Sequence, residues 1–261
     1  MGTYYAFTDL DHAPGPGSGL SFRFGKMESA RDFSGALRLL RVSGRELLAP
    51  SLETTARVGA DGGWLDGQRY PSRELRLRVQ MLDRSRLPEL SRRLGLGEKE
   101  LEISDEPGWS YRAYYGGGEL GDEVARLPFV DLVFYALDPF CYGPEHELEA
   151  TEADGGKAIQ LPAELTEPPA LETLELTLGK SAKVLRLEGA GQTIALHGEA
   201  EAGGVYRLDF QRLEITYNRA PALARLDLLS DFETFELQPG AKLVLGPEIE
   251  TARLRYRERK R

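Results

Sequence analysis

The side chains that most often carry out catalysis are few in this sequence and far apart. The three histidines, His12, His146 and His197, lie in no spacing that is typical of a metal site. Acid–base and nucleophilic catalysis need histidine, thiolate or paired carboxylates held close together. Cys141, the single cysteine, lies between two aromatic residues, which favours a buried apolar thiol.

Two short motifs approach known ligand-binding patterns without completing them. Gly179-Lys180-Ser181 is similar to the end of a phosphate-binding loop, but Leu174 stands where that loop has its first glycine. Asp9 and Asp11 match no complete calcium loop, and a solvated turn is the better interpretation. The sequence therefore predicts no enzyme, no metal site and no cofactor.

Composition excludes further classes of protein. A chain of 261 residues predicts one or two domains, and a single cysteine excludes a disulfide framework. The net charge of −9 gives no overall positive field for DNA or anionic lipid. The longest apolar run, Leu132–Leu137, is far shorter than the ~20 residues of a membrane span. The N-terminal MGTYYAF lacks a secretory pattern, so we expect a soluble chain from a reducing compartment.

Most segments between the glycines and prolines alternate with a period of two, which indicates strands. In Glu74–Met81 apolar and polar residues alternate, as in a strand with one buried face. Ala125–Leu137 is apolar on both parities, so it predicts a central strand covered on both sides, where Asp131 needs a partner or an interface. Gly116-Gly117-Gly118 is interpreted as a flexible loop.

The remaining pattern predicts a mainly β chain. Further strands are expected at Leu171–Leu178, Ala182–Glu188, Thr193–His197, Tyr206–Phe210 and Leu213–Tyr217. A tight turn at Gln211-Arg212, or alternatively a bulge, is expected between the last two. One helix is expected at about Arg86–Leu94, with Pro88 in its first turn and Gly95 at its end. Successive strands with turns every 8–12 residues favour sandwiches or barrels.

The sequence divides best between Asp138 and Pro169, where an acidic, glycine- and proline-rich stretch separates two sets of strands. We therefore predict two β-sandwich or barrel-like domains, residues 1–143 with the helix and residues 144–261. The run Arg253–Arg261 predicts a final strand with a basic outer face and a frayed end. One interpretation of this stripe is a binding site for nucleic acid or for an acidic partner. A solvated, charged tail is the favoured interpretation.

Several segments also follow one another in a recognisable order. They are Leu37–Leu48, Thr54–Tyr70 with Asp61-Gly62-Gly63 in its turn, the strand Glu74–Met81, the helix, Glu102–Tyr115, Asp138–Gly143 and Asp231–Gly240. From about residue 34 to 250, this order resembles the distal tail protein family of long-tailed, non-contractile (siphovirus-type) bacteriophages.

The resemblance implies a structural virion protein at the tail tip, assembled in the bacterial host cytoplasm. Its first domain would form a hexameric ring between tail tube and baseplate hub, with a channel for DNA. Its second domain would be a galectin-like sandwich projecting from the ring. The implied partners are other copies of the chain, the tail tube protein, the tail hub protein and receptor-binding proteins. DNA would only pass through, without membrane insertion of the protein.

The segment Thr54–Tyr70 is predicted to be a long loop that reaches a neighbouring subunit as an extended arm. Its 17 residues with four glycines are long for an idle connection in a compact domain. The alternative is a local hairpin whose Trp64 folds onto its own domain. The expected oligomer interface comprises Asp61, Gly62, Gly63, Trp64 and Asp131.

A second interpretation is a carbohydrate-binding β-sandwich for host-surface attachment, in which aromatic side chains stack on sugar rings. The candidates are Trp64, Trp109, Tyr111, Tyr114 and Tyr115. Trp109 and Tyr111 share a strand face at a spacing of two and would serve a core or an interface equally well. Fold analogy by itself assigns no sugar site.

Overall fold

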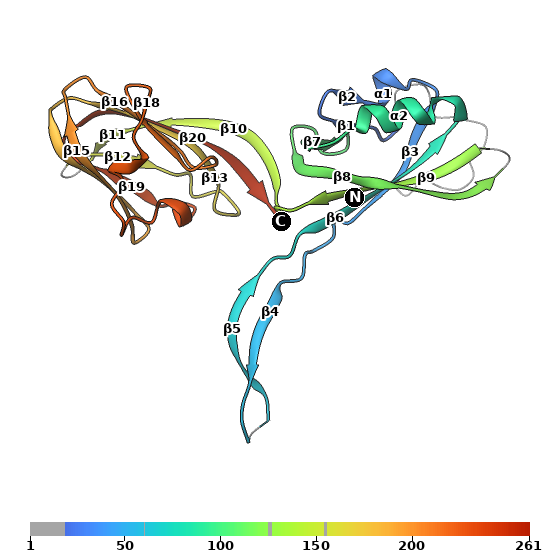
Figure 1. The fold of residues 1–261 in the computed structure, drawn as a ribbon, viewed down its shortest axis with the longest axis horizontal. Coiled ribbons are helices and arrows are strands. Elements are labelled where there is room, and N and C mark those ends of the chain that lie inside the picture. The colour runs from blue at the N-terminus through green and yellow to red at the C-terminus, as the bar shows by residue number, and fades with distance from the viewer. Residues whose placement is uncertain (1–18, 60, 125–126, 154–155) are drawn as a thin grey trace. The chain divides into compact units, whose positions relative to one another are not determined.

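The computed structural model describes residues 19–59, 61–124, 127–153 and 156–261, and these form two compact units. The first ends at Cys141 and also includes Arg261, and the second runs from Tyr142 to Lys260. Strands dominate both units (Figure 1), which confirms the prediction of a mainly β chain. The functional domains 1–143 and 144–261 stay a prediction.

The first unit holds a long antiparallel sheet, a two-turn helix and a separate strand pair. Its elements are β1 (Phe22–Phe24), β2 (Met27–Glu28), α1 (Ser29–Asp32), β3 (Leu37–Ser43), β4 (Ser51–Ala56), β5 (Gly63–Arg69), β6 (Arg73–Met81), the 3-10 turn η1 (Arg84–Arg86), α2 (Leu87–Leu94), β7 (Glu98–Ile103), β8 (Ser110–Val124) and β9 (Leu127–Ala136). The long sheet runs β2-β1-β7-β8-β9-β6-β3, while β4 and β5 form a sheet of their own.

The helix lies close to its predicted position. α2 has Pro88 in its first turn and ends at Gly95, whose φ of +57° favours glycine. Leu90 and Leu94 are buried on one stripe of α2 and join the core of the first unit. The short helix α1 was not predicted, because one turn carries no readable period.

Strand β9 is central, as predicted, but its second face is covered only in part, and not throughout as expected. It pairs with β6 on one edge and β8 on the other. Val130, Leu132 and Phe134 are buried on one face, whereas on the opposite face Val133 is 6% exposed and Tyr135 is 42% exposed. Only one face of the sheet packs on the core of the unit, so apolar residues on both parities did not mean two buried faces.

The prediction of a flexible loop at Gly116-Gly117-Gly118 is also wrong, because these glycines lie within β8. A Cβ atom on Gly116 would lie 2.3 Å from the ring of Tyr135 on the neighbouring strand. A side chain at position 116 would therefore displace that ring, and glycine here serves close packing between strands.

The second unit is a sandwich of two antiparallel sheets. Its elements are β10 (Cys141–Glu149), β11 (Thr151–Ala153), β12 (Gly156–Gln160), β13 (Ala170–Leu178), β14 (Ala182–Gly189), β15 (Gln192–Ala200), β16 (Val205–Asp209), β17 (Glu214–Tyr217), β18 (Ala220–Pro221), the 3-10 turns η2 (Leu223–Arg225) and η3 (Phe232–Thr234), β19 (Lys242–Leu245) and β20 (Ile249–Lys260). One sheet contains β20-β13-β16-β17-β18 and the other β11-β12-β19-β14-β15. The five strands predicted between 171 and 217 are confirmed, with each end within three residues of its predicted position.

The basic stripe at the C-terminus lies on β20, which continues to Lys260 and is not frayed there. Arg253 donates to Glu149 at 3.0 Å, and Arg255 donates to Glu147 at 2.7 Å. These carboxylates on β10 neutralise the stripe, which argues against a nucleic-acid site at this position.

Candidate assembly site

The strands β4 and β5 and their connection form a hairpin, residues 51–69, that we call the arm. Figure 1 shows it extending away from the long sheet of the first unit. Every residue of β4 is exposed, and so is every residue of β5 except the half-buried Gly67. The predicted long loop is therefore mostly strand, with Thr55 opposite Trp64 and Ala56 opposite Gly63.

The predicted glycines close the end of the arm. Gly62 has a φ of +86°, in the left-handed region that favours glycine. The backbone N–H of Arg57 donates to the carbonyl of Gly62 at 3.2 Å. A Cβ atom on Gly63 would lie 2.9 Å from the carbonyl oxygen of Thr55, so the two strands approach too closely for a side chain there. Asp61 stands exposed next to this turn.

Trp64 lies on the charged face of the arm. Its ring is 60% exposed, and the guanidinium of Arg57 lies 4.0 Å from the ring centroid. An Arg–aromatic contact of this kind contributes about 0.5–1 kcal/mol at an exposed site. The same face carries the Glu53–Arg69 ion pair at 3.1 Å. Trp64 does not fold into the core of its own unit, so the local alternative for this side chain is wrong.

The other face of the arm has no charged side chain. By the alternation of β4, Leu52, Thr54 and Ala56 point to this side, and Leu65 joins them because it pairs with Thr54. Leu52 is 57% exposed and Leu65 is 61% exposed. This uncharged face was not predicted, because the segment was interpreted as a loop, although the alternation within Leu52–Ala56 is a signal for a strand.

A buried arginine fixes the root of the arm, which is the segment that leads into β4. Arg73, at the start of β6, donates to the carbonyls of Gly44 at 2.8 Å, Glu46 at 3.1 Å and Pro139 at 3.1 Å. It is 2% exposed, and its Nη2 has no hydrogen-bond partner among the described residues. Since a buried cation is costly unless its donors are satisfied, Arg73 ties the segment that leads into β4 firmly to the sheet. The alternation of β6 places Arg73 on the face that points to the core, so the sequence pattern already indicated that this side chain is buried.

A glycine makes room for this root. Gly44 has a φ of +90°, and a Cβ atom there would lie 1.9 Å from the carbonyl oxygen of Glu74. Tyr111 lies beside Arg73, with the guanidinium 5.8 Å from its ring centroid. Burial raises the pKa of Tyr111, so this phenol stays neutral at physiological pH.

Asp131 lies on the long sheet and not on the arm, so a single chain does not bring it beside Asp61–Trp64. It stands opposite Arg78 of β6, with 4.0 Å between the carboxylate and the guanidinium. On the same face Arg76 pairs with Glu74 at 2.5 Å and with Glu119 at 3.5 Å. The outer face of this sheet thus carries charged side chains of both signs, several of them in ion pairs. Asp131 has a partner in its own chain, and its role at an interface stays a prediction.

The residues considered for catalysis are dispersed. Among the described residues no group of three or more His, Cys, Asp and Glu could hold a metal ion. His146 contacts Glu258 at 2.9 Å in a half-buried pair, and His197 contacts Asp227 at 2.7 Å in an exposed pair, both in the second unit. Cys141 is buried, as predicted. His12, Asp9 and Asp11 lie outside the described residues. In the part of the chain that the structure describes, no helix is long and apolar enough to cross a membrane.

The five aromatic candidates for sugar stacking do not form one platform. Trp64 lies on the arm, whereas Tyr111 is buried in the core of the first unit and Trp109 packs, partly buried, against that core. Tyr115 packs on Phe134, with ring centroids 5.6 Å apart. Tyr114 on β8 is partly exposed opposite Tyr135. As a group these side chains give no support to the carbohydrate-binding interpretation.

Comparisons with known proteins agree with the resemblance found in the sequence. Residues 166–259 match the family model described as "Siphovirus-type tail component, C-terminal domain". A segment of 138 residues, 50% of this chain, is 28% identical to the distal tail protein of Bacillus phage SPP1. That segment spans 54% of the phage protein, about half of its length.

The fold agrees as well. The crystal structure of the SPP1 Dit protein matches with a TM-score of 0.73 and 17% identity, over 93% of this chain and 99% of that one. The likeness to this structure shows a shared fold. Together with the sequence matches it confirms the resemblance to distal tail proteins, which are phage tail components and not a family of enzymes.

Proposed function

We propose, from this resemblance, that the chain is the distal tail protein of a siphovirus-type bacteriophage. In this proposal it forms a hexameric ring at the tip of the tail, between the tail tube and the baseplate hub, and the ring leaves a channel for DNA. The ring assembles in the cytoplasm of the bacterial host. Its neighbours in the virion are the tail tube protein, the tail hub protein and receptor-binding proteins, and it does not insert into a membrane.

The exposed arm is the feature of the structure that best supports self-assembly. Leu52, Trp64 and Leu65 are each more than half exposed on a strand pair that has no core of its own. An isolated two-stranded hairpin is marginally stable in water, so a surface outside the chain would supply the missing contacts. Contacts of this head-to-tail kind close into a ring when the rotation between subunits divides the circle.

The interface of this ring includes Asp61, Gly62, Gly63 and Trp64 of the arm, and Asp131 on the outer face of β9. The arm would contribute exposed apolar area, and Asp131 would contribute one member of the charge pattern on the sheet. The net charge of −9 per copy supports passage of DNA without binding, because negative walls repel phosphates. The second unit is the galectin-like domain in this proposal, carried on the ring by the first.

The decisive experiment is the mass of the purified full chain under native conditions, followed by negative-stain imaging of the particles. Six copies in a closed ring are expected. Trp64→Ala should keep the folded spectrum and assemble more weakly, since the ring of Trp64 would bury part of its ~150–250 Å² between subunits. A chain that stays monomeric at all concentrations up to the millimolar range would contradict the proposal.

A further inference from the structure

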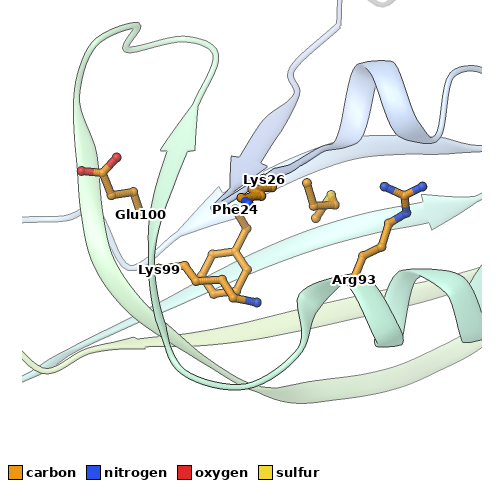
Figure 2. Close-up of a pocket in the computed structure, with 7 residues that line it drawn as sticks. Phe24, Lys26, Arg93, Lys99 and Glu100 are labelled. Atoms are coloured by element: carbon orange, nitrogen blue, oxygen red, sulfur yellow. The ribbon is translucent and has the colours of Figure 1, made fainter.

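The first unit contains a cavity of about 500 Å³ between β1, β2, α2 and β7 (Figure 2). Phe24 and Met27 are among the residues that line it and are themselves buried. Figure 2 shows the Lys99 side chain along the ring of Phe24 and Arg93 reaching from α2 toward the same space. Glu100 points away, because neighbouring residues of a strand face opposite sides. The cavity therefore joins an apolar wall to a cationic rim.

Two of its cations are not neutralised. Lys99 donates to the carbonyl of Leu94 at 2.5 Å, and its ammonium lies 5.0 Å from the centroid of the Phe24 ring. Neither Lys99 nor Lys26 pairs with a carboxylate within the described ranges of the chain. Arg93, in contrast, already pairs with Asp32 at 3.3 Å and with Glu89 at 3.0 Å. The chemistry that fits this cavity is an aliphatic side chain next to a free carboxylate.

The end of the arm carries this pair of groups. Val58 is fully exposed, and Asp61 is exposed three residues later in the same connection. No ion pair of Asp61 is found among the residues that the structure describes. In Figure 1 the arm leads away from the part of its unit that holds β1, β2 and α2, so the cavity of the same chain is not near its end.

Another exposed apolar turn fits the cavity less well. Leu228 and Leu229 of the second unit are almost fully exposed and follow Asp227. The carboxylate of Asp227, however, contacts His197 at 2.7 Å and accepts the backbone N–H of Leu229 at 2.8 Å. This carboxylate is engaged within its own chain, whereas that of Asp61 is available.

We propose that the end of the arm of one copy enters this cavity on a second copy. Val58 packs against the wall formed by Phe24 and the aliphatic part of Lys99, and Asp61 lies beside Lys26 and Lys99. The uncharged face of the arm then continues the contact along the receiving subunit. The inference rests on the proposed self-assembly and adds to it the surface that receives the arm.

Disulfide trapping between two differently tagged chains tests the contact. One chain carries Val58→Cys, the other carries Lys26→Cys, and the two are coexpressed and mildly oxidised. The native Cys141 is buried and does not compete. A disulfide that links positions 58 and 26 of different chains, identified by peptide mass spectrometry, is the expected result. Leu228→Cys, at an equally exposed site in the second unit, is the matched control and should not link to position 26.

The outcomes separate this inference from the proposed function. Rings that form without a link between positions 58 and 26, or that link 228 to 26 instead, overturn the inference and leave the ring intact. A chain that forms no ring overturns both.

Charge reversal gives an independent measurement. Asp61→Lys should weaken assembly about tenfold, because like charges would then meet at the rim of the cavity. Combining it with Lys26→Glu and Lys99→Glu should restore most of that loss, while Glu214→Lys on the exposed side of β17 should leave assembly unchanged. Equal effects of Asp61→Lys and Glu214→Lys, or no rescue by the reversed lysines, contradict the contact.

Discussion

Two hairpins of this chain are built alike and stabilised differently. In the second unit β16 and β17 pair with Tyr206 opposite Tyr217 and Leu208 opposite Ile215. Tyr206, Leu208 and Ile215 are buried in the sandwich core. In the arm β4 and β5 also pair antiparallel through a short connection, yet Leu52, Trp64 and Leu65 remain in water.

The difference shows what a strand pair needs beyond its own hydrogen bonds. The β16–β17 hairpin gains its stability by burying one face against the opposite sheet. The arm has cross-strand contacts, such as the 2.5 Å hydrogen bond from Thr55 to Asp66, but no opposite sheet. The uncharged face of the arm is therefore available for contact with another molecule, and substitutions on this face should affect association more than folding.

The largest expected effect is in the buried hairpin. Leu208→Ala should lower the free energy of unfolding by about 2–5 kcal/mol, because it removes a fully buried side chain and leaves a cavity. Leu65→Ala, the matched change in the arm, should lower it by less than about 0.5 kcal/mol. Urea unfolding of the full chain, under conditions where it is monomeric, measures both. If the two variants lost similar amounts of unfolding free energy, the two hairpins would not be stabilised differently.

A smaller loss is expected at the root of the arm. Arg73→Met should cost about 1–3 kcal/mol, because the carbonyls of Gly44, Glu46 and Pro139 lose a donor in a buried place. Limited proteolysis should then cut residues 44–50 faster than in the wild-type chain. Arg69→Met, on an exposed arginine of the arm, is the control and should change neither quantity. Unchanged stability of the Arg73 variant would show that it does not hold the root.

Association should respond most to the uncharged face of the arm. The double variant Leu52→Ser, Leu65→Ser should raise the dissociation constant of the assembly about tenfold or more, since each buried leucine contributes about 1.5–3 kcal/mol. Its thermal unfolding as a monomer should stay within a degree or two of the wild type, because both leucines are exposed there. Sedimentation velocity over a concentration series gives the constant. Assembly of wild-type strength would exclude this face from the interface.

The smallest expected effect concerns pH and belongs to the compact part of the first unit. The hydrogen bond from Arg31, followed by that from the backbone N–H of Glu28, lowers the pKa of Asp32 from 3.8 to about 2. Because the folded pKa lies below the unfolded one, this contribution to stability is present above about pH 4 and is lost as pH falls through about 2.

Melting temperatures of the wild type and of Asp32→Asn should therefore differ by a small, constant amount from neutral pH to about pH 5 and converge between about pH 4 and about pH 2. Asp61→Asn on the arm is the control and should follow the monomeric wild type throughout. If the difference between the two melting temperatures instead widened as the pH fell, the contribution of Asp32 to stability would have the opposite sign.

The local features of the fold were readable from the sequence. Pro88 and Gly95 bracket α2 because each restricts or permits a particular backbone angle, whatever the rest of the chain does. The turn predicted at Gln211-Arg212 is confirmed, and the side chain of Asp209 accepts both of its backbone N–H groups. The glycines of the arm were likewise marked by their spacing, although the strands that they connect were read as a loop.

The sequence by itself determined most of the strands, the face of each that carries apolar residues, and most of the turns, because period and backbone sterics act over a few residues; the strands of the arm and the glycine stretch of β8 were the exceptions. Only the tertiary structure decided which of those faces are covered and which charges are neutralised. The charge of Arg255 is neutralised by Glu147, which lies over a hundred positions earlier in the chain. Arg73 donates hydrogen bonds to carbonyls of residues that lie both before and after it in the sequence. Such contacts depend on how distant strands pair, and pairing is a property of the whole chain.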